Sequence, residues 1–134
     1  MSQEILSLTA TRMLTLYQQR KLSPVEVTRA MLDQIARLDR HTNAYCLVDP
    51  DTSLDWARAS EQRYQRGEAQ GKVDGVPVAV KDVFLTPMWP TVKGSRVIDP
   101  ATTLEKRSPC VAALERNGYV PLGKTTTPEF GWKG

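Results

Sequence analysis

The first half of the chain carries apolar side chains at helical spacing. Its opening segment predicts one amphipathic helix that ends near Arg20, with an apolar face of Leu6, Met13, Leu14, Leu16 and Tyr17. A second helix is expected to begin at residues 23–26, Ser-Pro-Val-Glu, because Ser23 and Glu26 can form a capping box around a proline in the first turn. Its apolar stripe is Val27, Met31, Ile35 and Leu38.

Short apolar runs alternate with helical segments in the rest of the chain. We predict strands at Tyr45–Val48, Val76–Val83 and Tyr119–Leu122, the first followed by a turn at Asp49-Pro50-Asp51. Helices are expected at Ser53–Arg66 and from Ser108 to Asn117, the latter closed by Gly118. A connector (67–74), a long ordered loop (86–106) and an end without regular structure (125–134) complete the pattern.

This order of elements predicts an α/β fold. Helices come first, and a strand, a crossover helix and another strand follow. The connection over residues 85–118 is long enough for the last two strands to pair in parallel. We expect a helical lead-in over about residues 1–70 and the start of an α/β core over about residues 71–134.

Charge and composition narrow the classes of function. The net charge is +3, from 18 basic and 15 acidic residues, and the basic residues are scattered. A nucleic-acid-binding protein would carry them as a clustered patch, so no nucleic-acid partner is expected. No apolar run approaches the length of a membrane span and the first residues do not resemble a signal peptide, so we expect a cytoplasmic protein without membrane attachment.

Few residues are suited to bind metal. Cys46 and Cys110 lie in apolar stretches and are interpreted as reduced core thiols. His41, the single histidine, is expected in a turn that ends a helix. A histidine-based metal site or a Ser-His-Asp triad is therefore not predicted, and we expect no metal and no organic cofactor.

One lysine stands in the most continuously apolar run, Gly75 to Phe84. Lys81 follows Val76-Pro-Val-Ala-Val80, which predicts a strand buried on both faces. One interpretation is a lysine at the end of a strand whose ammonium reaches solvent or pairs with Asp82. The other is a functional base, since apolar surroundings favour a neutral amine that can accept the proton of a serine hydroxyl.

A second lysine completes the P-loop expression G-x-x-x-x-G-K-[ST] over Gly118–Thr125. The expression has a mechanism only when a strand, a phosphate-binding loop and a helix follow in that order. Here the first glycine follows a helix, the intervening residues predict a strand, and the threonines and Pro128 after Lys124 are poor helix formers. Nucleotide binding at residues 118–125 is therefore the less favoured alternative.

Several blocks together resemble the amidase signature family, the Ser-Ser-Lys amide hydrolases. They are Gly75-Val-Pro-Val-Ala-Val-Lys81-Asp82, Pro90-Thr-Val-Lys-Gly94-Ser95, Val111-Ala-Ala-Leu-Glu-Arg-Asn-Gly118 and Gly123-Lys-Thr-Thr-Thr-Pro-Glu-Phe130. The resemblance extends to the leading helices and covers nearly the whole chain. It implies helices followed by the first strands of a mixed central sheet of the amidase signature fold, which stays incomplete within these residues.

The resemblance also implies a chemistry. Lys81 aligns with the family's catalytic lysine, which exchanges a proton with a serine on a cis peptide bond. That serine in turn activates the serine that attacks the carboxamide, giving an acid and ammonia or an amine. Both serines of the family lie in a glycine-rich block downstream of the last matching stretch. The sequence ends at Gly134, before such a block, and Ser95 belongs to a different block. We therefore expect an amino-terminal portion of one amidase signature domain, inactive alone, with a small-molecule amide as substrate of the complete protein.

Two further expectations concern the surroundings of Lys81. The family resemblance suggests that Thr91–Ser95 and Thr125–Phe130 frame the substrate cleft, and it leaves the contact at Thr126 open because relatives often have asparagine there. The alternatives are a turn in which Gly94 has positive φ, and a capped loop that packs Phe130 and Trp132. As an alternative for the whole protein, we consider a non-catalytic module that docks on a partner chain, or an oligomer, that completes its sheet.

Overall fold

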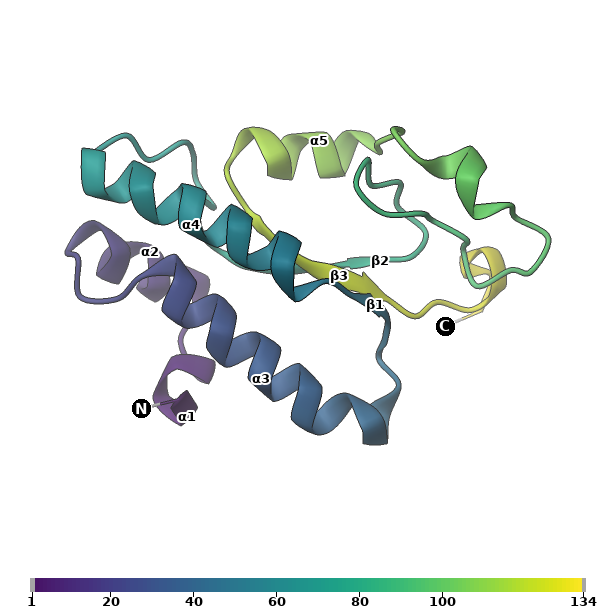
Figure 1. Ribbon diagram of the computed structural model, residues 1–134, viewed down its shortest axis with the longest axis horizontal. Helices are drawn as coiled ribbons and strands as arrows, with labels where there is room; N and C mark the ends of the chain where they lie inside the picture. Colours follow the sequence, from purple (N-terminus) through teal and green to yellow (C-terminus); the bar gives the residue numbers. More distant parts are fainter. Residues whose placement is uncertain (1, 134) are drawn as a thin grey trace.

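The protein combines five α-helices with a three-stranded sheet in the residues that the computed structural model describes, 2–133 (Figure 1). The helices are α1 (Ser2–Leu6), α2 (Ala10–Gln18), α3 (Pro24–Thr42), α4 (Pro50–Arg66) and α5 (Pro109–Arg116). The strands are β1 (Tyr45–Val48), β2 (Pro77–Lys81) and β3 (Val120–Thr125), and two short 3-10 helices are η1 (Pro100–Thr103) and η2 (Glu129–Gly131). The α/β fold class predicted from the sequence is confirmed.

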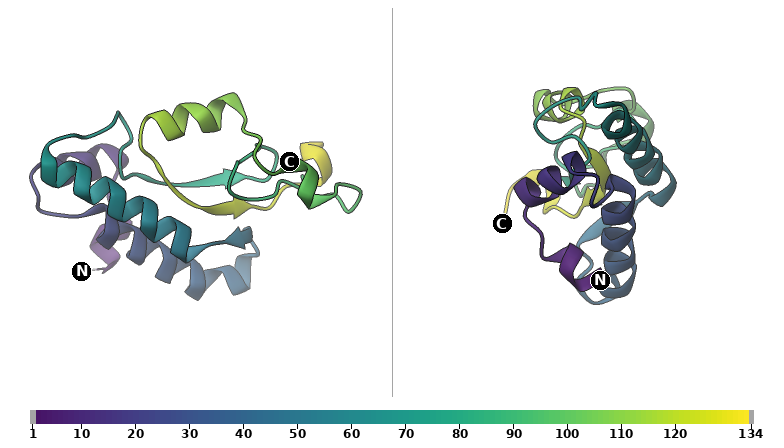
Figure 2. Two further views of the ribbon diagram at one scale, coloured as in Figure 1. Left: turned by 45° about the horizontal axis from the view of Figure 1, so that its top comes forward. Right: turned by 90° about the vertical axis from the view of Figure 1, so that its left-hand side faces the viewer.

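The sheet is mixed, with strand order β1-β3-β2. β2 and β3 pair in parallel, as expected from the long connection between them, and β1 pairs with β3 antiparallel. α3 and α4 lie on one side of the sheet and α5 lies on the other (Figures 1 and 2). This arrangement buries the central strand β3 almost completely, whereas β2 is more exposed.

Capping decides where the helices begin. The predicted capping box is present, since the Ser23 hydroxyl accepts from the Glu26 N–H at 3.1 Å and the Glu26 carboxylate accepts from the Ser23 N–H at 2.8 Å. The single helix predicted at the start of the chain was wrong. Thr9 caps a new helix there, because its hydroxyl accepts from the backbone N–H of Arg12. The turn predicted at residues 49–51 is likewise the start of α4, with Asp49 as its N-cap.

Three clusters of buried side chains connect these layers. The first joins α2 to α3, the second joins α3 and α4 to β3, and the third lies between α5 and the parallel strands. Their buried members are Met13, Tyr17 and Val27; Val25, Ala57 and Val120; and Val80, Val111 and Tyr119. The third cluster fixes the position of β2, and with it the lysine at its end.

A buried ion pair anchors the start of the α/β part. Asp74, in the connector after α4, accepts hydrogen bonds from Arg63 at 2.6 and 2.9 Å and from Ser60 at 2.6 Å. Gly118 packs directly against this carboxylate, and a Cβ there would lie 2.7 Å from an Asp74 oxygen. Its φ of +79° confirms the left-handed cap expected after α5.

Candidate active site

The carboxyl ends of β2 and β3 lie at the same end of the sheet, where the loop of residues 82–108 and the end of the chain also meet (Figure 1). Lys81 is the last residue of β2 and is the register partner of Thr125, the last residue of β3. In open α/β sheets, ligands bind outside the carboxyl ends of the parallel strands. This end is therefore the candidate active site.

Lys81 is exposed, so the strand predicted to be buried on both faces was wrong. The reason is the strand order. β2 is at the edge of the sheet, and no other strand of residues 2–133 pairs with its outer side. Lys81 lies at one end of an open apolar groove of about 290 Å³, whose other walls include Phe84, Cys110 and Leu114. Phe84 is 42% exposed, so this edge presents unburied apolar surface.

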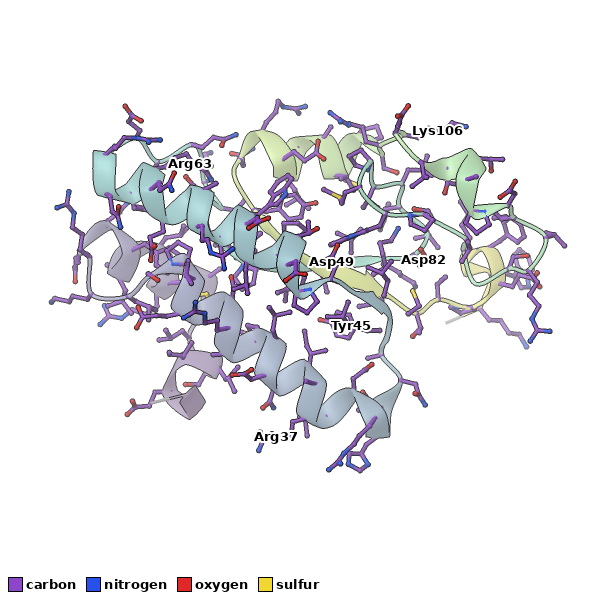
Figure 3. All side chains as sticks on the ribbon, in the orientation of Figure 1. Arg37, Tyr45, Asp49, Arg63, Asp82 and Lys106 are labelled. Carbon is purple, nitrogen blue, oxygen red and sulfur yellow. The ribbon has the colours of Figure 1, made fainter. Side chains whose placement is uncertain are left out.

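The buried lysine of this region is Lys124, which is 0% exposed in the central strand. Its Nζ lies 3.1 Å from the Asp82 carboxylate and donates to the Phe84 carbonyl at 2.8 Å and to the Thr91 hydroxyl at 2.6 Å. Burial lowers the pKa of Lys124, and the hydrogen bond and negative charge of Asp82 oppose this effect. Figure 3 shows Asp82 near the carboxyl end of the sheet.

The two lysines are directed to opposite faces of the sheet. Val80 is the register partner of Lys124, and Lys81 is the partner of Thr125. Side chains alternate between faces along a strand. Lys124 therefore shares a face with buried Val80, whereas Lys81 and Thr125 share the other face.

The segments 91–95 and 127–131, which the family resemblance brought into question, lie against each other. The Ser95 hydroxyl donates to the Glu129 carboxylate at 2.6 Å, and the Phe130 N–H donates to the Lys93 carbonyl at 2.8 Å. Gly94 has φ of +65°, as expected for a turn, and a Cβ there would lie 2.6 Å from the Thr127 carbonyl oxygen. Both segments border the carboxyl end of the sheet.

Side chains in the same segments correct two interpretations. Phe130 and Trp132 are 55% and 88% exposed, so the loop does not pack them into the core. The Thr126 hydroxyl donates to the Asn43 and Ala44 carbonyls at 3.2 and 3.3 Å, which attaches the segment to the end of α3. This is the contact that the sequence left open.

The long loop before α5 is held by polar contacts in its first part. The Trp89 indole donates to the Asp49 carboxylate at 3.0 Å, and the Thr91 N–H donates to the Thr103 hydroxyl at 2.8 Å. Hydrogen bonds from Thr52 and Trp89 lower the pKa of Asp49. The ordered loop predicted for residues 86–106 is therefore tied both to α4 and to η1.

The remaining candidate residues lie apart from a reactive arrangement. Cys46 and Cys110 are exposed, so their interpretation as core thiols was wrong. His41 is in the last turn of α3, on the surface. Residues 120–125 of the P-loop expression form β3, and its lysine is buried between protein groups. A phosphate-binding loop followed by a helix is not formed.

Comparison with known proteins decides the family. The family model for amidases matches residues 26–133. The chain belongs to the amidase signature family. A glutamyl-tRNA(Gln) amidotransferase subunit from Acidothermus cellulolyticus is 38% identical over 133 residues, which are 95% of this chain and 25% of that protein.

Solved amidase signature structures share the fold. A bacterial aryl acylamidase of the family superposes with a TM-score of 0.86 at 28% identity, over 95% of this chain and 26% of the other. The peptide amidase of Stenotrophomonas maltophilia superposes with a TM-score of 0.84 at 25% identity, over 92% of this chain and 26% of the other. The chain thus spans about a quarter of the length of the relatives that it matches.

Sequence reasoning missed Lys124 as a structural centre of this region. Its immediate neighbours gave a signal, since Leu122, Gly123 and Lys124 continue a predicted strand that becomes central once it has a neighbour on each side. The partner Asp82 is 42 positions away, and only the register of β2 against β3 brings the two together.

Proposed function

We propose that residues 1–134 are the amino-terminal part of a single amidase signature domain that hydrolyses carboxamides to an acid and ammonia or an amine. The observation that carries this proposal is the place of Lys81. It ends β2, is exposed at the carboxyl end of a parallel strand pair, and stands in the block that resembles the family's lysine motif. No metal or organic cofactor is part of the proposed reaction.

The role proposed for Lys81 is proton transfer. Its neutral amine accepts the proton of a serine hydroxyl, and the activated oxygen attacks the amide carbonyl carbon. The proton then passes to the leaving nitrogen, the C–N bond breaks, and water hydrolyses the acyl-enzyme. The Ser95 hydroxyl is already bonded to Glu129, so we assign the nucleophile to a serine outside residues 1–134.

The substrate is proposed only as a class. The similar proteins include an aryl acylamidase, a peptide amidase and one component of an amidotransferase, and their names share the amide group. In the part of the chain that the structure describes, no helix has the length and apolar character needed to cross a membrane. The cytoplasmic location expected from the sequence is part of this proposal.

A second candidate is a module whose sheet is completed by a partner chain. The unpaired outer side of β2 and the apolar groove beside it favour this possibility, because exposed strand edges associate readily. Purification of the native protein tests it. A second polypeptide with a serine- and glycine-rich loop should copurify, and a single polypeptide that hydrolyses amides would exclude this candidate.

The activity is tested on the complete polypeptide whose reading frame contains these residues. Ammonia release from a panel of primary carboxamides is measured for the natural protein, for Lys81→Met and for Lys72→Met. Lys72 is an exposed lysine in the connector and serves as the control. We expect turnover to be lost only in Lys81→Met, by at least about 100-fold. Near-natural turnover of Lys81→Met would refute the role of Lys81.

A further inference from the structure

Lys124 is a charged side chain placed where charge is costly. It is 0% exposed, and its partner Asp82 is 2% exposed. Removing two charges from water costs several kcal/mol per ion, and their attraction repays this only with good geometry and further hydrogen bonds. An apolar pair of similar size would stabilise a core as well, so the ion pair calls for another explanation.

All three partners of Lys124 lie in the ten residues that follow Lys81. The ammonium contacts the Asp82 carboxylate, the Phe84 carbonyl and the Thr91 hydroxyl at 3.1, 2.8 and 2.6 Å. The Thr91 hydroxyl in turn donates to the Phe84 carbonyl at 3.2 Å. One buried side chain of the central strand thus holds the whole segment by which the chain leaves β2.

The same segment is tied to Lys81 itself. The Asp82 N–H donates to the Thr125 carbonyl at 2.9 Å and continues the ladder between the parallel strands. The Phe84 N–H donates to the Lys81 carbonyl at 3.0 Å and closes a turn directly after it. A shift of residues 82–84 would therefore rotate the backbone of Lys81 and move its amine on the opposite face.

We infer that Lys124 is a positioning residue for the proton-transfer step. From the buried face of the sheet it holds Asp82, Phe84 and Thr91, so that Lys81 is presented in one direction on the open face. This inference rests on the proposed function of Lys81. Lys124 itself touches neither substrate nor reacting atoms.

The test uses a double variant of the complete polypeptide, Asp82→Asn with Lys124→Met. Lys124→Met alone would leave the Asp82 carboxylate buried without its partner and would destabilise the fold. The double variant removes both charges and keeps both sizes, so the fold is expected to persist. Arg63→Met is the matched control, since it breaks the Arg63–Asp74 ion pair near the other end of α4 (Figure 3).

Three quantities are compared: the melting temperature, kcat and KM for an accepted carboxamide, and hydrogen exchange in residues 82–91. For the double variant we expect a similar melting temperature, faster exchange in this segment, and a kcat about 10- to 100-fold lower with little change in KM. For Arg63→Met we expect a lower melting temperature with unchanged kcat at a temperature where it is folded.

The outcomes separate this inference from the proposed function. A folded double variant with natural kcat, or unchanged exchange in residues 82–91, would overturn the inference and leave the role of Lys81 intact. A double variant that does not fold would assign the ion pair to stability and would also overturn it. Full activity of Lys81→Met, measured in parallel, would refute the proposed function instead.

Discussion

The tightest backbone contact of the sheet lies at Gly123, which makes Gly123→Ala an informative substitution. Gly123 is in the central strand, between Val48 of β1 and Ala79 of β2 in register. Its φ is +149°, and a Cβ added there would lie 2.2 Å from the Leu47 carbonyl oxygen. The obstructing atom belongs to the backbone, so no rotation of a side chain can relieve the overlap.

The expected cost has two parts. Forcing an extra methyl group into a packed site costs about 1–3 kcal/mol. Holding alanine at a backbone conformation that side chains rarely adopt costs a further 1–3 kcal/mol, approximately. The sum, about 2–6 kcal/mol, is a large share of the stability of a typical domain, which is about 5–15 kcal/mol. Both β1 and β2 pair with β3, so the loss concerns the whole sheet.

Gly67→Ala is the matched control. Gly67 also has positive φ, +72°, at the end of α4, but a Cβ there would meet nothing within 4 Å. Only the backbone term remains, about 1–2 kcal/mol. Urea unfolding, followed by far-ultraviolet circular dichroism, gives the free energy of unfolding for each variant. Equal losses for the two variants would refute the reasoning from close backbone approach.

Three further predictions concern charge, capping and the thiols. Burial opposes ionisation of Asp74, but hydrogen bonds from Arg63 and its neighbours outweigh this effect and lower its pKa below 3.8. The carboxylate therefore contributes stability above about pH 4 that is lost as pH falls further, so the stability difference between the natural protein and Asp74→Asn should shrink in acid unfolding series. Ser23→Ala should cost about 1 kcal/mol in urea unfolding, and a loss near zero would contradict the capping box. Cys46 and Cys110 should both react with a thiol reagent in the folded protein, whereas reaction only after unfolding would contradict their exposure.

Local chemistry explains which elements the sequence predicts well. The Ser23–Glu26 capping box, the strand Tyr45–Val48 and the left-handed glycine after α5 depend on residues only a few positions apart. The break after α1 was missed because the hydroxyl of Thr9 competes with an apolar pattern that continues through it. Short polar residues of this kind favour caps over helix interiors.

The candidate site was less predictable because it depends on strand order. An apolar run around Lys81 is typical of a buried parallel strand, yet β2 is at an edge in these residues and Lys81 is exposed. The buried lysine is one register position away on the neighbouring strand. Periodicity describes one strand at a time, and neither the pairing of Lys124 with Asp82 nor the contact of Ser95 with Glu129 is contained in it.

The central claim is that Lys81 activates a serine supplied from outside these residues. Reaction of the complete polypeptide with a sulfonyl fluoride, followed by peptide mapping with mass spectrometry, tests it most directly. In this reaction a serine oxygen bonds to sulfur, fluoride leaves, and the proton passes to the base. The account predicts one labelled serine beyond residue 134 in the natural protein and none in Lys81→Met. A label on Ser95, or equal labelling of both proteins, would contradict it.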